Sequence, residues 1–325
     1  KTDLNTGTVS LSISSGSLSG SSSASIVNGV ANFSGVKTNE SGTSKKLTAA
    51  YSSFSVLSNN FNVNAAAYNA AQSGVTTSAA TVASGSSITA TLTTKDAYGN
   101  LNPSGLPGIG AINFTSSAVG GTGTFSGLAA AGSGVYTASF TGSLVGAVTL
   151  GATISGVGVG HNASVTVTPA SAIQLFLTGV SSSVTAGATQ TLTVTAKDSL
   201  GNIDTGYSGT VTVTSDDSAA VIASPSTLTN GVGTFSVSFR TAGTFSLQAT
   251  DGTISQTQSG ITVSPAALSS LEFDQQPSST ANAGDVLIDQ PVIHAYDAYH
   301  NLVSTSGTPI TLTDRKSTRL NSSHG

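Results

Sequence analysis

The sequence predicts an all-β protein made of tandem domains, and three observations lead to this prediction. A short phrase recurs along the 325 residues, as KDAYGN at 95–100, KDSLGN at 197–202 and YDAYHN at 296–301. The separations of 102 and 99 residues are those of small domains in an array, not of a short solenoid repeat. Apolar and polar residues alternate almost everywhere, and no segment shows a helical period between capping residues.

In each copy, the strand before the phrase is the first clear element. In the third copy Leu192, Val194 and Ala196 alternate with polar residues, which predicts one face in the core and the other in water. Ala90 and Leu92 occupy the same register in the second copy. The Ser- and Thr-rich outer positions favour strands and disfavour helices.

The phrase itself predicts a turn, in which the aspartate accepts hydrogen bonds from backbone amides and the glycine adopts a positive φ. We assign a structural role in this turn to Asp96, Gly99, Asn100, Asp198, Gly201, Asn202, Asp297 and Asn301. As a simple turn cap, Asp198 is expected to contribute about 1 kcal/mol. In the fourth copy His300 replaces the glycine, so this turn is expected to differ from the others.

Further strands follow each turn. Val211 and Val213 define the next strand of the third copy, and Phe235, Val237 and Phe239 define a later one. Two more alternating segments close the copy, which gives about seven short strands in about 100 residues. Such a domain is expected to be an immunoglobulin-like sandwich of two antiparallel sheets.

The order of strand, Lys-Asp-x-x-Gly-Asn turn, spacer and Gly-Thr-Val-Thr-Val strand resembles the bacterial Ig-like repeats of invasin- and intimin-type adhesins and related large surface proteins. Residues 196–217 carry the closest match, and the resemblance covers essentially residues 1–313. It implies tandem Ig-like domains on a bacterial surface. It says little about a ligand, because this fold hosts many functions.

Alternating strands followed by small residues mark the ends of copies, as VNA at 63–65, VTPA at 167–170 and VSPA at 263–266. The predicted domains are 67–169 and 170–266, with the C-terminal part of a domain in 1–66 and the N-terminal part of another in 267–313. Residues 314–325 resemble, residue for residue, a translated short-read sequencing adapter. We interpret them as an artefact in a metagenomic gene fragment and exclude them from functional argument.

Composition excludes several classes of function. Outside residues 314–325 the chain has 7 basic and 13 acidic residues, so clustered cations for nucleic-acid binding are missing. No apolar run reaches about 18 residues, so no membrane span is predicted. The chain has no cysteine and shows no pattern of nucleophile, base and orienting acid. We therefore expect no enzyme activity and no bound cofactor.

Calcium is the one metal for which the sequence offers candidates. In an Ig-like topology the recurring turn joins the second and third strands and faces the preceding domain, where carboxylates and linker carbonyls could meet. The candidate ligands are Asp198, Asp204, Glu272, Asp274 and Asp297. The alternative is that each aspartate only caps its own turn, which the low carboxylate count favours, because calcium takes six or more oxygens.

These observations predict a structural or adhesive stalk, extracellular or on a bacterial cell surface, that holds a distal domain away from the cell. Its partners would be a host or matrix surface, contacted through domains outside this chain. Four copies with short linkers would span more than about 100 Å. One alternative is a set of spacer modules in a large secreted polysaccharide-active enzyme. Another is sugar binding by a copy itself, for which the candidate exposed aromatics are Tyr98, Tyr207, Tyr296 and Tyr299.

Overall fold

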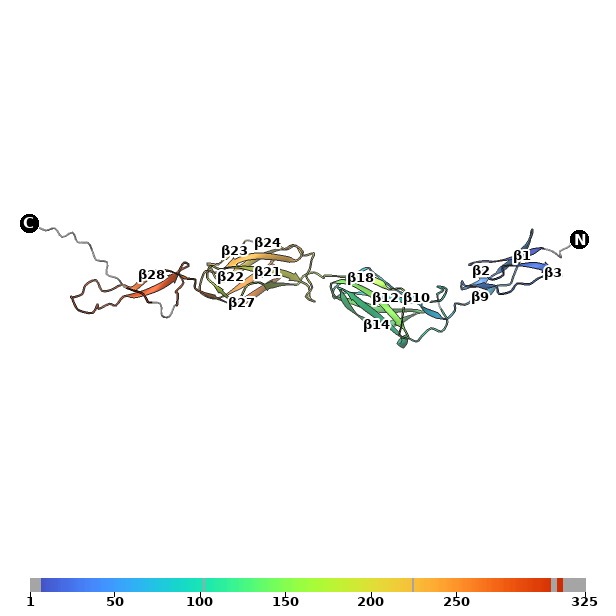
Figure 1. Cartoon of the computed structure of the whole chain (residues 1–325), viewed down its shortest axis with the longest axis horizontal. Coiled ribbons are helices and arrows are strands. Elements are labelled where there is room, and N and C mark those ends of the chain that lie inside the picture. The colour runs from blue at the N-terminus through green and yellow to red at the C-terminus, as the bar shows by residue number, and fades with distance from the viewer. Residues whose placement is uncertain (1–6, 102, 224, 305–308, 312–325) are drawn as a thin grey trace, which may run out of the picture. The chain divides into compact units, whose positions relative to one another are not determined.

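The computed structural model of the chain describes residues 7–101, 103–223, 225–304 and 309–311. The predicted adapter-derived segment, 314–325, lies outside the described residues. The all-β prediction is confirmed, because every regular element in the described ranges is a strand except one 3-10 turn, Ile109–Ala111 (Figure 1). The described part of the chain holds no helix of the length and apolarity needed to cross a membrane.

The chain divides into two compact units, residues 1–172 with 197–206, and residues 173–196 with 207–325. The second copy of the recurring turn therefore belongs to the first unit. Among the described residues no sheet crosses the predicted domain boundaries after residues 66, 169 and 266. The domain boundaries themselves remain predictions.

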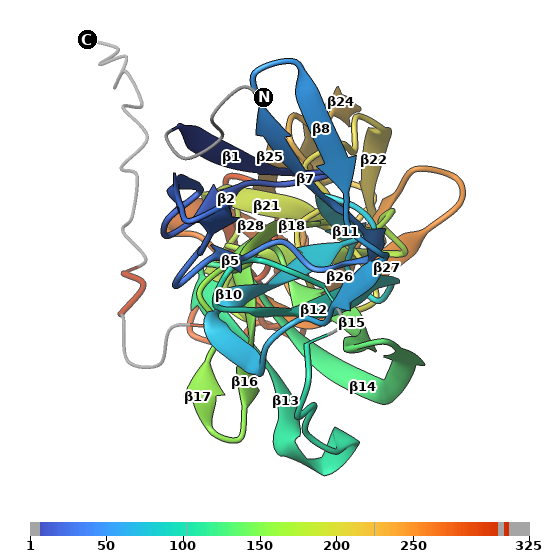
Figure 2. The same cartoon turned by 90° about the vertical axis from the view of Figure 1, so that its right-hand side faces the viewer.

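Residues 67–169 form a sandwich of two sheets, with strand orders β10-β12-β15-β14 and β11-β18-β16-β13 and with β17 paired to β16 (Figures 1 and 2). The strands are β10 (Tyr68–Thr77), β11 (Thr81–Ala83), β12 (Ser87–Asp96), β13 (Ile112–Val119), β14 (Thr122–Gly132), β15 (Val135–Leu144), β16 (Gly146–Ile154), β17 (Val157–Gly158) and β18 (Ala163–Thr168). This grouping is that of the ABED and CFG sheets of immunoglobulin-like domains.

Residues 170–266 repeat this arrangement with the orders β19-β21-β25-β23 and β20-β27-β26-β22-β24. The strands are β19 (Gln174–Thr178), β20 (Ser183–Thr185), β21 (Thr189–Lys197), β22 (Thr210–Ser215), β23 (Val221–Ile222), β24 (Ser226–Thr227), β25 (Val232–Ser238), β26 (Gly243–Thr250) and β27 (Ser255–Ser264). Both predicted complete copies are therefore sandwiches with the same strand pairing, apart from the short strands β17 and β24.

The first copy holds mostly short strands, and the described part of the fourth copy holds one pair. Residues 1–66 contain a sheet of order β4-β3-β1-β7-β8 and the pairs β2-β5 and β6-β9, and residues 267–313 contain the pair β28-β29. The strands are β1 (Thr8–Ile13), β2 (Leu18–Ser19), β3 (Ser23–Val27), β4 (Val30–Ala31), β5 (Lys37–Thr38), β6 (Gly42–Lys45), β7 (Leu47–Tyr51), β8 (Phe54–Leu57), β9 (Phe61–Val63), β28 (Leu268–Gln275) and β29 (Val292–Asp297).

The core of each sandwich follows from strict alternation along the strands. In β12, Ala90 and Leu92 are fully buried, as the register predicts. Phe125 packs between the rings of Phe114 and Phe140, with centroids 5.4 and 5.2 Å away. Burying large side chains of this kind contributes about 1.5–3 kcal/mol each, which allows these cysteine-free domains to form a core.

Two details differ from the sequence prediction. The first strand of each complete copy is split, so that β10 and β19 pair in one sheet while β11 and β20 pair in the other. These second halves run parallel to the last strands, β18 and β27, so the sheets are not purely antiparallel. Alternation has the same period in both kinds of pairing, so the sequence carries no signal for a strand that changes sheet.

Candidate functional site: the repeated junction

The recurring phrase forms the same turn in all three copies; we call residues 96–100, 198–202 and 297–301 the marker turns. Each follows the second strand of its copy, and its first and last residues are joined by a backbone hydrogen bond. The aspartate N–H donates to the asparagine carbonyl over 3.1, 2.9 and 3.0 Å in the first, second and third marker turns, respectively. The fourth residue donates back to the aspartate carbonyl over 3.1 Å in each.

The aspartate side chain caps this turn from within. One carboxylate oxygen accepts the N–H groups two and four residues further on, over 2.8–2.9 Å. The donors are Tyr98 and Asn100 for Asp96, Leu200 and Asn202 for Asp198, and Tyr299 and Asn301 for Asp297. The three aspartates are at most 3% exposed. The sequence predicted this capping role, and the structure places all three aspartates in it.

The second carboxylate oxygen reaches the segment that links each copy to the one before it. It accepts the backbone N–H of an alanine there, over 2.8–3.2 Å. The pairs are Asp96 with Ala66, Asp198 with Ala170, and Asp297 with Ala266. The hydroxyl of Ser84 also donates to Asp198. Each aspartate therefore fixes its own turn and the linker with the same carboxylate.

The asparagine that ends each marker turn binds the end of the preceding copy. Its side-chain amide donates to one carbonyl, and its side-chain oxygen accepts the N–H two residues further on. The pairs are Asn100 with Asn39 and Ser41 (2.7 and 3.0 Å), Asn202 with Ser143 and Val145 (2.8 and 3.2 Å), and Asn301 with Arg240 and Ala242 (2.8 and 2.7 Å). We call the aspartate, the asparagine and these linker and loop groups the junction clasp.

Two of the receiving loops are held by charged side chains that sequence reasoning did not single out as functional. Asp217 is buried and accepts the N–H groups of Arg240 and Thr241 over 2.9 and 3.1 Å. Lys45, also buried, lies 3.3 Å from Glu40 in the loop that receives Asn100. The local sequence does not mark these residues, because Asp217 accepts from backbone groups 23 and 24 residues away and Lys45 also donates to Ser15, 30 residues before it.

His300 does not change the turn, so the expectation that the fourth copy would differ is wrong. Its φ is +66°, within the left-handed region, and its N–H bonds to the Asp297 carbonyl as Gly99 and Gly201 do in their turns. The imidazole stacks on Tyr296 with ring centroids 4.2 Å apart, and its Nδ1 lies 3.6 Å from Glu272 Oε1. These contacts offset the strain of about 1–2 kcal/mol that a side chain adds in this region.

Hydrogen bonding dominates the electrostatics of the clasp. Burial alone would raise the pKa of Asp198, but the bonds from Ser84, Asn202 and Ala170 outweigh it and hold that pKa at about 2. The pKa values of Asp96 and Asp297 are lowered for the same reason: burial raises them, and the donors of their own clasps more than compensate. All three carboxylates are therefore ionised at neutral pH.

The calcium candidates are not brought together. Asp204 accepts the N–H groups of Ala172 and Gly206 over 2.9 and 3.0 Å, while Glu272 and Asp274 lie beside His300 and His294 at 3.6 and 3.8 Å. In the described ranges no three His, Cys, Asp or Glu side chains gather in a way that could hold a metal ion. These bonds support the turn-capping interpretation, and calcium binding remains an untested prediction.

The tyrosines considered for sugar binding are in part engaged with the protein. Tyr207 donates to Asp251 over 2.5 Å, and the guanidinium of Arg240 lies 5.6 Å from the ring centre of Tyr299. Tyr98 is 61% exposed, but it stands at the first junction beside the loop that Asn100 binds. Tyr296 stacks on His300. The four tyrosines therefore make separate contacts, in the third copy, in the fourth copy and at two junctions, and do not form a shared aromatic platform.

Comparison with known proteins gives no family model that matches the chain and no matching curated protein. Solved structures similar to it include FdeC, an Escherichia coli adhesin, with 21% identity, a TM-score of 0.40 and coverage of 78% of this chain and 85% of that one. InvD of Yersinia pseudotuberculosis has 21% sequence identity and a TM-score of 0.38, and the match covers 72% of this chain and 73% of InvD. Invasin, a bacterial integrin-binding protein, has 17% sequence identity and a TM-score of 0.38, and the match covers 83% of this chain and 55% of invasin.

Acid is expected to weaken the clasps, with a midpoint set by the low pKa of their carboxylates. A group whose pKa is lower in the folded state stabilises fully above its unfolded value, here 3.8, and loses this effect as the pH falls toward about 2. We expect the thermal midpoint of the chain to fall steeply between about pH 4 and pH 2. Asp198→Asn should flatten this dependence. An unchanged slope in that variant would contradict the assignment.

Gly99→Val is expected to destabilise the second copy by about 1–3 kcal/mol through backbone strain alone. Gly99 has a φ of +86°, and a Cβ added there would meet no atom within 4 Å. Gly158→Val is the matched control, because that glycine has equally open surroundings and no positive φ. Peptide-resolved hydrogen exchange of the whole chain measures both effects, and equal protection in the two variants would show that the strain is absent.

Proposed function

We propose that this chain is a spacer in which Ig-like repeats are joined by hydrogen-bonded clasps, serving as the stalk of a bacterial surface protein. The observation that carries the proposal is the threefold repetition of the clasp. Asp96, Asp198 and Asp297 hold the linkers, and the matching asparagines hold the ends of the preceding copies. A chain whose repeats act independently has no need for such bonds at every junction.

The clasp has the properties that such a stalk requires. Its side chains are largely buried, so water competes weakly for their hydrogen bonds, and its charged group is fully ionised at neutral pH. It uses hydrogen bonds to the backbone at each linker, so the sequence of the domain surface can vary without loss of the junction. In this proposal the chain lies outside the cell or on its surface, and a host or matrix partner is bound by other domains.

The proposal is tested by small-angle X-ray scattering of the chain in solution. We expect a maximum dimension above about 100 Å, since each copy carries strands of about eight residues at about 3.3 Å per residue and four copies follow one another. The dimension should stay constant between low and high salt, because the clasps are buried. A compact particle, or a scattering profile typical of freely moving beads, would overturn the proposal.

A further inference from the structure

The two complete sandwiches differ at one edge. In the third copy, the segment between β22 and β25 returns across the sandwich, and β24 covers the start of β22 through the pairs Thr210–Thr227 and Val211–Ser226. Leu228, which follows β24, is only 1% exposed, and its N–H donates over 3.0 Å to the carbonyl of Gly209, just before β22. The outer side of β22 is therefore partly occupied by the chain itself.

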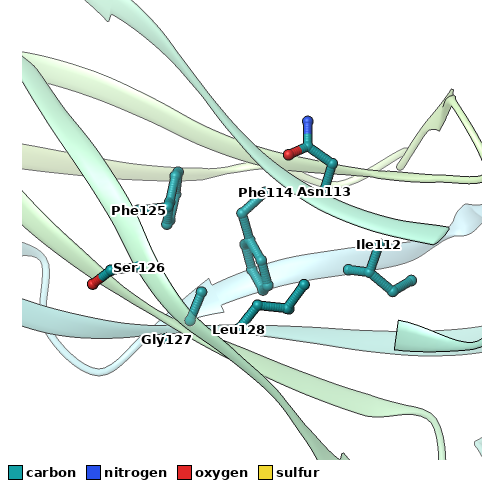
Figure 3. A pocket seen from close by; sticks show the side chains of 8 residues that line it. Ile112, Asn113, Phe114, Phe125, Ser126, Gly127 and Leu128 are labelled. Atoms are coloured by element: carbon teal, nitrogen blue, oxygen red, sulfur yellow. The ribbon is translucent and has the colours of Figure 1, made fainter. Parts of the chain in front are cut away.

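Among the described residues of the second copy, no strand covers the corresponding edge. Only two residues, Gly120 and Gly121, separate β13 from β14, and these strands end the orders of the two sheets (Figure 2). A cleft of about 200 Å³ opens between them, where Phe114 lies between Phe125 and Leu128 (Figure 3). Leu128 is 37% exposed, in contrast to the buried Leu228.

Strand β13 presents a long free edge. It pairs with β16 along eight residues, and no other strand of the described residues pairs with it. Its last five residues, 115–119, are all exposed. An edge of this length carries unpaired backbone N–H and C=O groups that can bind another extended strand, and natural proteins usually protect such an edge with charge, proline or a covering segment.

We propose that the β13 edge pairs antiparallel with the same edge of a second copy of this chain, centred on Ser117. An antiparallel pair about a twofold axis brings the same residues of both chains together, so it requires an edge that does not repel itself. Residues 115–119 read TSSAV, with small uncharged side chains. No charged residue occurs between Asp96 and Lys197, so nothing in this copy opposes the approach.

The other edges are less suited to such pairing. On the opposite side of the second copy, the segment before β18 covers β10, where the Val75 N–H donates to the His161 carbonyl over 2.9 Å. In the third copy, β24 covers the start of β22, and β22 is followed by Asp216, an exposed carboxylate that would face its own charge across a twofold axis. Strand β14 ends the other sheet of the second copy and is also uncharged, but its pairing with β15 shifts register at three points, so its edge is less regular than that of β13.

Cysteine cross-linking of the whole chain tests the pairing, because the native sequence has no cysteine. Ser117 lies on the outer face of the sheet, since Ile112 and Phe114 alternate inward. Its Cα would lie about 4.5–5.5 Å from that of its counterpart, within the range of a disulfide. We expect Ser117→Cys to form disulfide dimers at least about tenfold faster than Thr166→Cys, an exposed control on the inner strand β18.

Charge reversal provides the second measurement and guards against accidental oxidation. Ser117→Lys should abolish concentration-dependent association in sedimentation, Ser117→Glu should do the same, and an equimolar mixture of the two should restore it. Thr166→Lys should associate like the native chain. Equal cross-linking at the two cysteine positions, a native chain that stays monomeric at high concentration, or association that Ser117→Lys leaves intact would each overturn the proposal.

Discussion

Replacing Asp198 by alanine is expected to destabilise the third copy by about 3 kcal/mol or more, since an unsatisfied buried donor costs about 1–3 kcal/mol and several would be left at once. The carboxylate is fully buried and accepts hydrogen bonds from Leu200, Asn202, Ala170 and Ser84. Alanine removes all of these acceptors at a fully buried position, so the donors lose their partner away from solvent. Urea unfolding followed by hydrogen exchange of the third copy measures the loss.

Asp216→Ala is the matched control in the same copy. Asp216 also accepts two hydrogen bonds, from the N–H and hydroxyl of Ser246 at 2.7 and 2.8 Å, but it is exposed to water. Water can replace an exposed acceptor, so we expect a much smaller loss than for Asp198→Ala. Asp198→Asn should fall between the two, because it keeps one oxygen for the turn. Equal losses for Asp198→Ala and Asp216→Ala would refute the role of burial.

The sequence was sufficient to predict the turn but not the contribution of its aspartate to the free energy of unfolding. Bonds from Asp198 to the N–H groups of Leu200 and Asn202 are local, so residue types and spacing predict them. The donors Ser84 and Ala170 belong to other segments, and no local rule indicates that they meet the same carboxylate. The structure therefore leads us to expect a larger loss than the value of about 1 kcal/mol for a simple cap.

The receiving half of the clasp could not be predicted for a related reason. Asn100 binds the carbonyl of Asn39 and the N–H of Ser41, both of them backbone groups, and every residue except proline offers such groups. The side chains at these positions differ from junction to junction, so only the asparagine itself repeats in the sequence. The recurrence of the asparagine is visible in the sequence, whereas its backbone partners can be identified only from the fold.

The strands were predictable because alternation is a property of the sheet itself, and the change of sheet within the first strand was not. Val82 in β11 and Val75 in β10 are both buried, yet they belong to opposite sheets of one sandwich. In the sequence, an inward-facing residue shows the same alternation whichever of the two sheets its strand joins. Which sheet a strand joins depends on which sheet has an edge free to pair with it, and that depends on the fold of the whole domain.

Asn202→Ala is expected to loosen the junction that this residue clasps without unfolding the copies on either side. The substitution removes two bonds to the preceding copy, the Nδ2 donation to the Ser143 carbonyl at 2.8 Å and the acceptance of the Val145 N–H at 3.2 Å. Losing them should weaken the clasp by about 1–3 kcal/mol, which raises the population of open junctions by about five- to 150-fold. The marker turn persists, since Asp198 keeps its backbone donors.

Spin labels on cysteines introduced at Ser164 and Thr262, both exposed strand positions, report this change as a distribution of distances. We expect a broader distribution for Asn202→Ala than for the native chain, with unchanged hydrogen exchange inside each sandwich. Asn113→Ala is the control, because Asn113 is exposed on β13 and has no part in a clasp. If both variants leave the distribution as narrow as in the native chain, the asparagine does not couple the repeats, and the linker bond of Asp198 must carry the junction by itself.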